Sequence, residues 1–224
     1  MEITQGKIVD WTEGGEVTIK AAVPSIDRAI LRDYRTVEVG FSDGRKISAQ
    51  QRKLCYKLLH AIGEWVGDDI ESIKATMKMD FIANRQRCLA RKLFSLADVD
   101  MTTAREFNSY LIDFIVHHGV PTDFRLAEEC EDIRRYIYAC FMAKRCAVCG
   151  REGADLHHVD RIGIGGDRKK INHIGRRALP LCRAHHSELH SMSEPRFLKM
   201  YHLEPIAIDE TIAKKYRLNT KERR

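Results

Sequence analysis

The chain has 224 residues, of which 44% are hydrophobic and 31% are charged, with a net charge of +6 at pH 7. These values are typical of one or two globular domains, and the modest positive charge allows a nucleic-acid partner without requiring one. No apolar run is long enough to cross a bilayer and no signal peptide is evident, so we expect no membrane contact. Seven cysteines, an odd number with about half in ligand-like pairs, argue against a disulfide framework and favour a reducing cytoplasm.

The first part of the chain is predicted to form β-structure. Apolar and polar residues alternate over 7–12 and 16–22, on either side of a Gly-Gly pair, which predicts a β-hairpin. A short helix is expected over 25–31, and a third strand over 36–41 that ends at an Asp-Gly turn signal. A small β-sheet should therefore precede the helices.

The helical part is predicted to begin with a capping box. Ser48 and Gln51 are three residues apart, so each side chain can bond the other's backbone N–H. The helix that follows carries a hydrophobic stripe at helical spacing, made of Leu54, Leu58, Ile62 and Trp65. Its start is strongly basic, with Arg45, Lys46, Arg52, Lys53 and Lys57. Charge alone favours a solvated helix face for these residues.

Three more helices are predicted before the cysteine-rich stretch. One covers 69–80 and opens with a capping aspartate. The next opens with a second capping box, Thr103 and Glu106, and stops at Gly119. The last covers 126–142 and leads directly into the cysteines, so any domain boundary should fall at its end.

The order of short motifs in this half resembles the Orf (NinB) recombination mediators of lambdoid phages. The motifs are SAQQRKLCYKLLHAIG, then MDF, then TAREF opening a helix that ends in HGV, within residues 30–125. Members of that family are homodimers that bind single-stranded DNA and help to load a recombinase. The resemblance implies a homodimer, a recombinase or single-strand binding protein as a further partner, and DNA contacts by the basic residues at the start of the Ser48 helix.

The stretch from Cys146 to His190 holds three of the seven cysteines and six of the ten histidines. Two pairs with a two-residue gap, Cys146 with Cys149 and Cys182 with His185, have the spacing of a tetrahedral zinc site. Zinc requires soft, deprotonated ligands, and a tight CxxC turn supplies two of them. The alternative is a set of buried cysteines, which two correctly spaced pairs make less attractive. We therefore predict a structural Zn²⁺ here.

The remaining histidines suggest a second metal centre. Strands are expected over 154–158 and 179–181, followed by a helix from Arg183, on which His186 and His190 share one face. The loop between the strands is rich in glycine and in cations suited to a phosphodiester backbone, namely Arg161, Arg168, Lys169 and Lys170. The alternative is that the His-His pair of the first strand supports the zinc or the core.

The pattern LHH…GG…N…LPLCRAHHSELH, preceded by CxxC, resembles the HNH endonucleases. Their ββα-metal fold is a two-stranded hairpin and a helix around one divalent ion. The resemblance implies that His157, His186 and His190 are ligands of that ion and that His158 is the general base. The ion is left open among Mg²⁺, Mn²⁺, Zn²⁺ and Ni²⁺, because histidine suits several metals.

This sequence departs from the HNH pattern at its middle letter. The usual asparagine register falls on Arg177, while Asn172 and His173 lie further upstream. Either could pin the loop that bears the base or bind phosphate, and we favour His173. An ordinary surface histidine is nearly as good an interpretation.

The sequence thus predicts an α+β protein. A mixed DNA-binding unit with a small β-sheet and several helices would cover 1–142, a zinc-stapled ββα-metal unit 143–205, and a basic tail 206–224. The stretch 214–224 of that tail is expected to be frayed. The expected function is metal-dependent hydrolysis of DNA, single-stranded or branched, in phage recombination or replication in a bacterial cytoplasm. One alternative is a non-catalytic single-stranded DNA-binding mediator with a structural zinc module, which the missing asparagine favours. Another is a nuclease whose N-terminal half binds protein.

Overall fold

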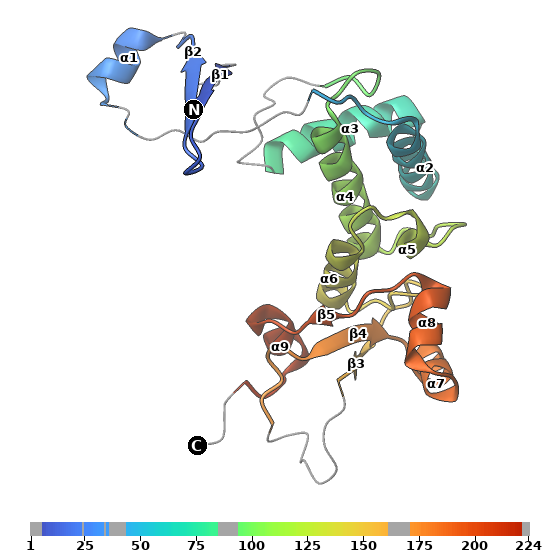
Figure 1. The fold of residues 1–224 in the computed structure, drawn as a ribbon. Coiled ribbons are helices and arrows are strands. Elements are labelled where there is room, and N and C mark those ends of the chain that lie inside the picture. Colours follow the sequence, from blue (N-terminus) through green and yellow to red (C-terminus); the bar gives the residue numbers. More distant parts are fainter. Residues whose placement is uncertain are drawn as a thin grey trace.

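A computed structural model shows an α+β architecture, as predicted, with helices and two small β-sheets (Figure 1). Helices α4 (Met101–His118) and α6 (Ile133–Ala143) form the central part of the chain and connect the helical region to the C-terminal sheet (Figure 1). In the part of the chain that the structure describes, no helix is long and apolar enough to span a membrane. The described residues are 6–23, 25–33, 35, 44–84, 94–160 and 171–220.

The N-terminal hairpin is confirmed. Strand β1 (Gly6–Trp11) pairs antiparallel with β2 (Val17–Ala21), and the short helix α1 (Ile26–Leu31) follows. Every residue of β1 is exposed, and Trp11 is 68% exposed. The strand predicted over 36–41 lies outside the described residues.

The first long helix, α2 (Ala49–Val66), has the predicted capping box. The Ser48 hydroxyl accepts from the Gln51 N–H at 3.0 Å, and the Gln51 side-chain oxygen accepts from the Ser48 N–H at 3.1 Å. The hydrophobic stripe is buried as predicted, except at its end, where Trp65 is 45% exposed. Trp65 lies in the last turn, before the left-handed Gly67, and contacts only the edge of the Phe114 ring and the His118 ring among the aromatic groups described.

Two helices pack against α2, namely α3 (Ile70–Asn84) and α4 (Met101–His118). The predicted capping box of α4 is wrong. Asp100 is the cap, because its backbone is extended and its carboxylate accepts from the Thr103 N–H at 2.8 Å. Thr103 therefore lies inside the first turn. The predicted stop is confirmed at Gly119, whose φ of 68° suits glycine.

The last predicted helix of this half is interrupted. It forms α5 (Leu126–Glu129) and α6 (Ile133–Ala143), with Cys130 in an extended conformation between them. Asp132 restarts the helix because its side chain accepts from the Arg135 N–H at 3.1 Å.

The C-terminal sheet has the order β3-β4-β5 and is antiparallel throughout. Its strands are β3 (Asp155–His158), β4 (Arg177–Leu181) and β5 (Ile206–Ala207). His157 lies opposite Leu179 and His158 opposite Ala178. The two strands predicted around the histidine pair are therefore confirmed.

Three helices complete this part of the chain: α7 (Arg183–Ser191), α8 (Glu194–Tyr201) and α9 (Glu210–Tyr216). Helix α7 starts where it was predicted. Helix α9 falls in the predicted basic tail and reaches into the stretch expected to be frayed, and it packs on α6. Helix α6 also packs against β4 and β5, so buried side chains of the helical part and the C-terminal sheet meet in a continuous hydrophobic core. The division of the chain into domains remains a prediction.

Candidate metal centre and catalytic site

The four residues predicted to hold a structural zinc lie together. The ligand atoms of Cys146, Cys149, Cys182 and His185 are all within 4.8 Å of one another. The Cys149 and Cys182 sulfurs are 3.8 Å apart, and the His185 Nδ1 atom is 3.4 Å from the Cys146 sulfur and 3.3 Å from the Cys182 sulfur. A tetrahedron with Zn–S bonds of about 2.3 Å has edges of about 3.8 Å, so both the donor set and its spacing fit Zn²⁺.

Local structure prepares Cys182 and His185 for a metal, whereas burial raises the pKa of the Cys146 thiol to about 12. Burial raises the pKa of the Cys182 thiol, but hydrogen bonds from the His185 backbone N–H and from the neighbouring thiols outweigh it, so the pKa lies below its ordinary value. Cys182 is also the N-cap of α7, where the helix dipole stabilises a thiolate. Burial lowers the pKa of His185, which keeps the imidazole neutral, as a metal ligand must be.

A contact that the sequence did not reveal supports the histidine of this cluster. The Tyr201 ring packs edge-on against His185, with centroids 5.6 Å apart, and its hydroxyl donates to Glu188 at 2.8 Å. Glu188 is half-buried, and this bond links α7 to α8. Tyr201 and Glu188 are thirteen residues apart, so no local sequence pattern reveals their bond.

The second predicted cluster also assembles. His157, on β3, meets His186 and His190, which are four residues apart on α7, and their ligand atoms lie within 4.8 Å of one another. His157 is buried, with 7% of its surface exposed, whereas His190 is exposed. The group therefore reaches from the core to the surface. Three imidazole donors fit a divalent ion that keeps coordination positions for water and substrate.

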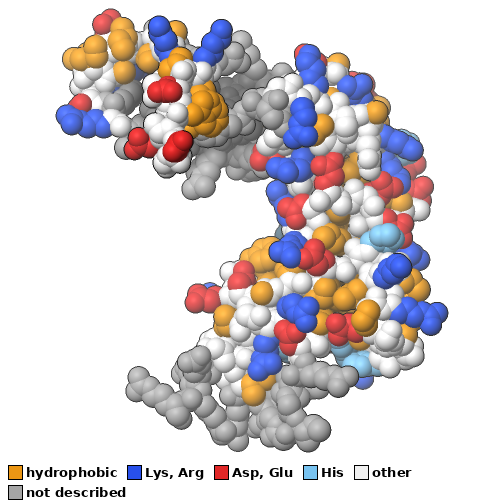
Figure 2. All heavy atoms as spheres, in the orientation of Figure 1, with side chains coloured by type: hydrophobic (Ala, Val, Ile, Leu, Met, Phe, Trp, Pro, Cys, Tyr) orange, Lys and Arg blue, Asp and Glu red, His pale blue; other side chains and the backbone are white. Residues whose placement is uncertain are grey.

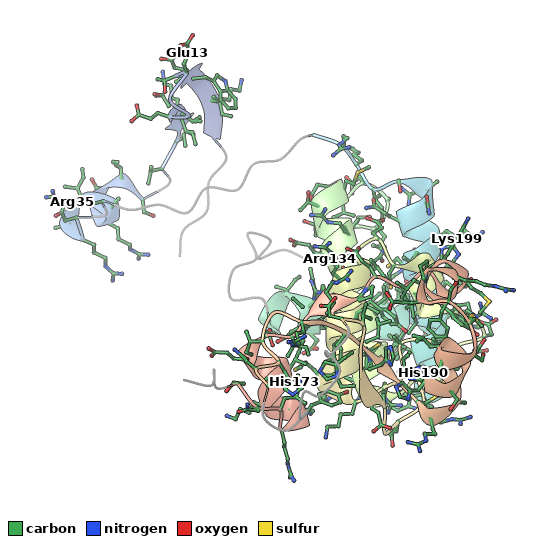
Figure 3. All side chains as sticks on the ribbon, turned by 60° about the horizontal axis from the view of Figure 1, so that its bottom comes forward. Glu13, Arg35, Arg134, His173, His190 and Lys199 are labelled. Atoms are coloured by element: carbon green, nitrogen blue, oxygen red, sulfur yellow. The ribbon has the colours of Figure 1, made fainter. Side chains whose placement is uncertain are left out.

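His158, the last residue of β3, contacts His173. The His158 Nε2 atom is 2.8 Å from the His173 Nδ1 atom, and His173 is only 3% exposed. His173 and His190 are both labelled in the C-terminal part in Figure 3. Asn172, the other middle-letter candidate, has its side-chain oxygen on the backbone N–H of Ile174 at 2.9 Å, so it shapes the local turn. Of the two candidates, the structure brings His173 to His158.

Arg177, which stands in the usual asparagine register, closes the end of the hairpin. Its side chain reaches Asp160 at 2.8 and 3.0 Å, and its backbone N–H donates to the same carboxylate at 2.7 Å. In addition, the Val159 N–H donates to the Arg177 carbonyl at 2.9 Å. The backbone just beyond His158 is therefore held by an ion pair. The sequence pattern did not single out Asp160, although an acid two residues after the predicted base was a visible signal.

The basic residues at the start of α2 differ in how they are engaged. Arg52 donates to the Ala97 carbonyl at 2.8 Å, and Lys57 pairs with Glu129 at 2.6 Å while lying 3.9 Å from the centre of the Phe124 ring. The side chains of Arg45, Lys46 and Lys53 are exposed. In the view of Figure 2, Lys and Arg side chains alternate with acidic ones over the helical part. The loop cations Arg161, Arg168, Lys169 and Lys170 lie outside the described residues.

Comparison with known proteins places the chain in a protein family. A model of the protein family described as "Putative HNHc nuclease" matches residues 23–219, which is most of the chain and includes both the helical part and the histidine site. No curated protein and no solved structure matches the chain. The HNH resemblance is confirmed at the level of the family, and the Orf-like character of the first half stays a prediction.

Proposed function

The chain belongs to this family of HNH nucleases, and from that premise we propose that it is a metal-dependent endonuclease that hydrolyses DNA phosphodiester bonds. The observation that carries the proposal is the pairing of His158 with His173 directly beside a three-histidine group that can hold a divalent ion. A structural zinc at the cysteine cluster would fix the start of α7, which bears two of those three histidines.

In this mechanism His158 is the general base. Because His173 engages its Nε2 atom, we assign proton acceptance from water to the Nδ1 atom. The matching tautomer has Nε2–H of His158 donating to Nδ1 of His173, which leaves Nδ1 of His158 without a proton. The same contact would stabilise the imidazolium once the proton has arrived. His157, His186 and His190 would hold the divalent ion, which when bound stabilises charge on the phosphate and on the leaving oxygen.

The finer features of the substrate are also proposals. Single-stranded or branched DNA, a homodimer, and a recombinase or single-strand binding protein as partner follow from the Orf-like motifs of the first half, as do a phage recombination role and a bacterial cytoplasmic setting. The exposed side chains of Lys46, just before α2, and of Lys53, near its start, support a phosphate contact there. Arg52 and Lys57 are held by protein partners and would contribute less.

The nuclease proposal is tested by incubating the full chain with single-stranded, duplex and branched DNA. We expect cleavage with Mg²⁺ or Mn²⁺, none with a chelator, and recovery when the ion is restored in excess. DNA binding without cleavage under every ion would instead favour the non-catalytic mediator, the candidate to which Arg177 in the asparagine register points. The two functions are thus separated by a single assay.

We expect the double substitution Lys46→Glu, Lys53→Glu to weaken DNA affinity at least tenfold and to reduce the slope of log affinity against log salt by about two, one per lost phosphate contact. Fluorescence anisotropy with labelled single-stranded DNA at several salt concentrations measures both quantities. The control is Lys20→Glu, which reverses an exposed charge on β2. Equal slopes for the double variant and the wild type would show that this end of α2 does not contact DNA phosphates.

A further inference from the structure

The end of α9 lies against the segment that carries His173. The Leu218 N–H donates to the Ala213 carbonyl at 2.8 Å, which closes the helix, and the next residue is Asn219. The Asn219 carbonyl accepts from the His173 N–H at 3.1 Å, and its side-chain amide donates to the Ile171 carbonyl at 3.0 Å. One residue near the C-terminus therefore bonds the backbone on both sides of residue 172.

A second contact ties the same segment to the C-terminal region. The Gly175 N–H donates to the Ile208 carbonyl at 2.9 Å, and the Ile208 N–H donates to the Arg176 carbonyl at 2.9 Å. These bonds continue the β4–β5 pairing as far as residue 175. Upstream of that point, the His173 carbonyl accepts from the Arg176 N–H at 3.3 Å, and the His173 N–H donates to Asn219. The N–H of His173 is thus fixed from outside the two strands and the helix that form the HNH motif.

We propose that Asn219 is a positioning residue of the nuclease site, which holds His173 where its Nδ1 atom meets the Nε2 atom of His158. This inference rests on the function proposed above. In the HNH pattern an asparagine is expected to pin the loop near the base, but Arg177 occupies that position here. Asn219, 42 residues further along the chain, instead bonds the backbone at Ile171, two residues before His173. Its side-chain amide is the part that a substitution can remove, because the amide N–H₂ donates to the Ile171 carbonyl.

The variants are chosen to separate the amide from the backbone. Asn219→Ala deletes the donor, and Asn219→Asp keeps the size of the side chain but sets a carboxylate against the Ile171 carbonyl oxygen. Thr220→Ala is the matched control, an exposed position on the same segment. Thermal melting and zinc content are measured for each variant, and Asn219→Asp decides the question if Asn219→Ala proves poorly folded.

Both Asn219 variants should lower kcat about ten- to a hundredfold at unchanged KM, since misplacing a catalytic group by about 1 Å costs up to about a hundredfold. In a His173→Ala background, Asn219→Ala should cost nothing further, because its effect passes through that ring. A general loss of stability would not give that non-additivity. Wild-type kcat in both Asn219 variants, or an equal loss with and without His173, overturns the inference while leaving the nuclease function intact.

A readout independent of cleavage comes from ¹⁵N-histidine NMR of the full chain. Asn219→Ala should shift the ring signals of His173 and His158 and leave that of His60, an exposed residue of α2, in place. Unchanged His173 and His158 signals would overturn the inference. If the wild type does not cut DNA at all, the nuclease proposal fails, and these signals alone decide whether Asn219 holds His173.

Discussion

His158→Ala is expected to lower kcat for DNA cleavage by about 10²- to 10⁴-fold, the usual contribution of a general base. The ring of His158 can be deleted with little effect on the fold, because it is only half-buried and lies at the end of a strand. His157, the adjacent residue, points into the other histidine group and should still bind its ion. The loss should therefore appear in kcat and not in metal content or DNA affinity.

The measurement compares single-turnover cleavage by wild type, His158→Ala and a control, with DNA binding and metal content determined on the same preparations. His60→Ala is the control, since His60 is an exposed histidine paired with Glu64 on α2, away from the histidine clusters. Cleavage by His158→Ala within threefold of the wild-type rate would show that another group takes the proton. His173 would then be the first candidate.

The features that could be predicted from the sequence are those determined by residues a few positions apart in the chain. The Ser48–Gln51 capping box, the stop at Gly119 and the assembly of the two candidate ligand groups depend on side chains whose spacing is visible in the chain. Ligand pairs at a gap of two, and histidines at i and i+4, leave few geometries open.

The parts that escaped prediction depend on competition or on distant contacts. Asp100 and Thr103 were both able to cap α4, and the choice of Asp100 coincides with an isolated bridge between Lys46 and Asp100 that fixes the extended entry of the chain. The break before α6 also comes from an aspartate cap, because Asp132 caps a new helix inside a stretch whose pattern predicts one continuous helix. Arg177 bonds Asp160, 17 positions away, and Asn219 bonds Ile171, 48 positions away. Sequence periodicity cannot reveal contacts at such separations.

Cys146→Ser is expected to have the largest effect on stability. Cys146 is fully buried and joins the knuckle after α6 to the start of α7, so the sulfur cluster links two parts of the core. Structural zinc contributes on the order of 10 kcal/mol to the folding of small zinc domains. A loss of even about half of that should lower the melting midpoint of a chain of this size by about 10–20 °C.

Zinc content by elemental analysis and the melting midpoint by circular dichroism test this expectation. Wild type should carry zinc that Cys146→Ser lacks. Cys130→Ser is the matched control, because its thiol donates to the Leu126 carbonyl at 2.8 Å, a bond that a serine hydroxyl can keep. Undiminished zinc in Cys146→Ser would remove this residue from the ligand set.

The same substitution should also abolish cleavage, for a reason that differs from the loss in His158→Ala. Cys182 and His185 lie at the start of α7, and His186 and His190 follow on that helix, so in the proposed mechanism a bound zinc would orient the ligands of the second metal. We expect Cys146→Ser to lose the second metal along with the zinc, whereas His158→Ala keeps both. A Cys146→Ser protein that lacks zinc but still cuts DNA at the wild-type rate would show that the three-histidine group is held by β3 and the core alone.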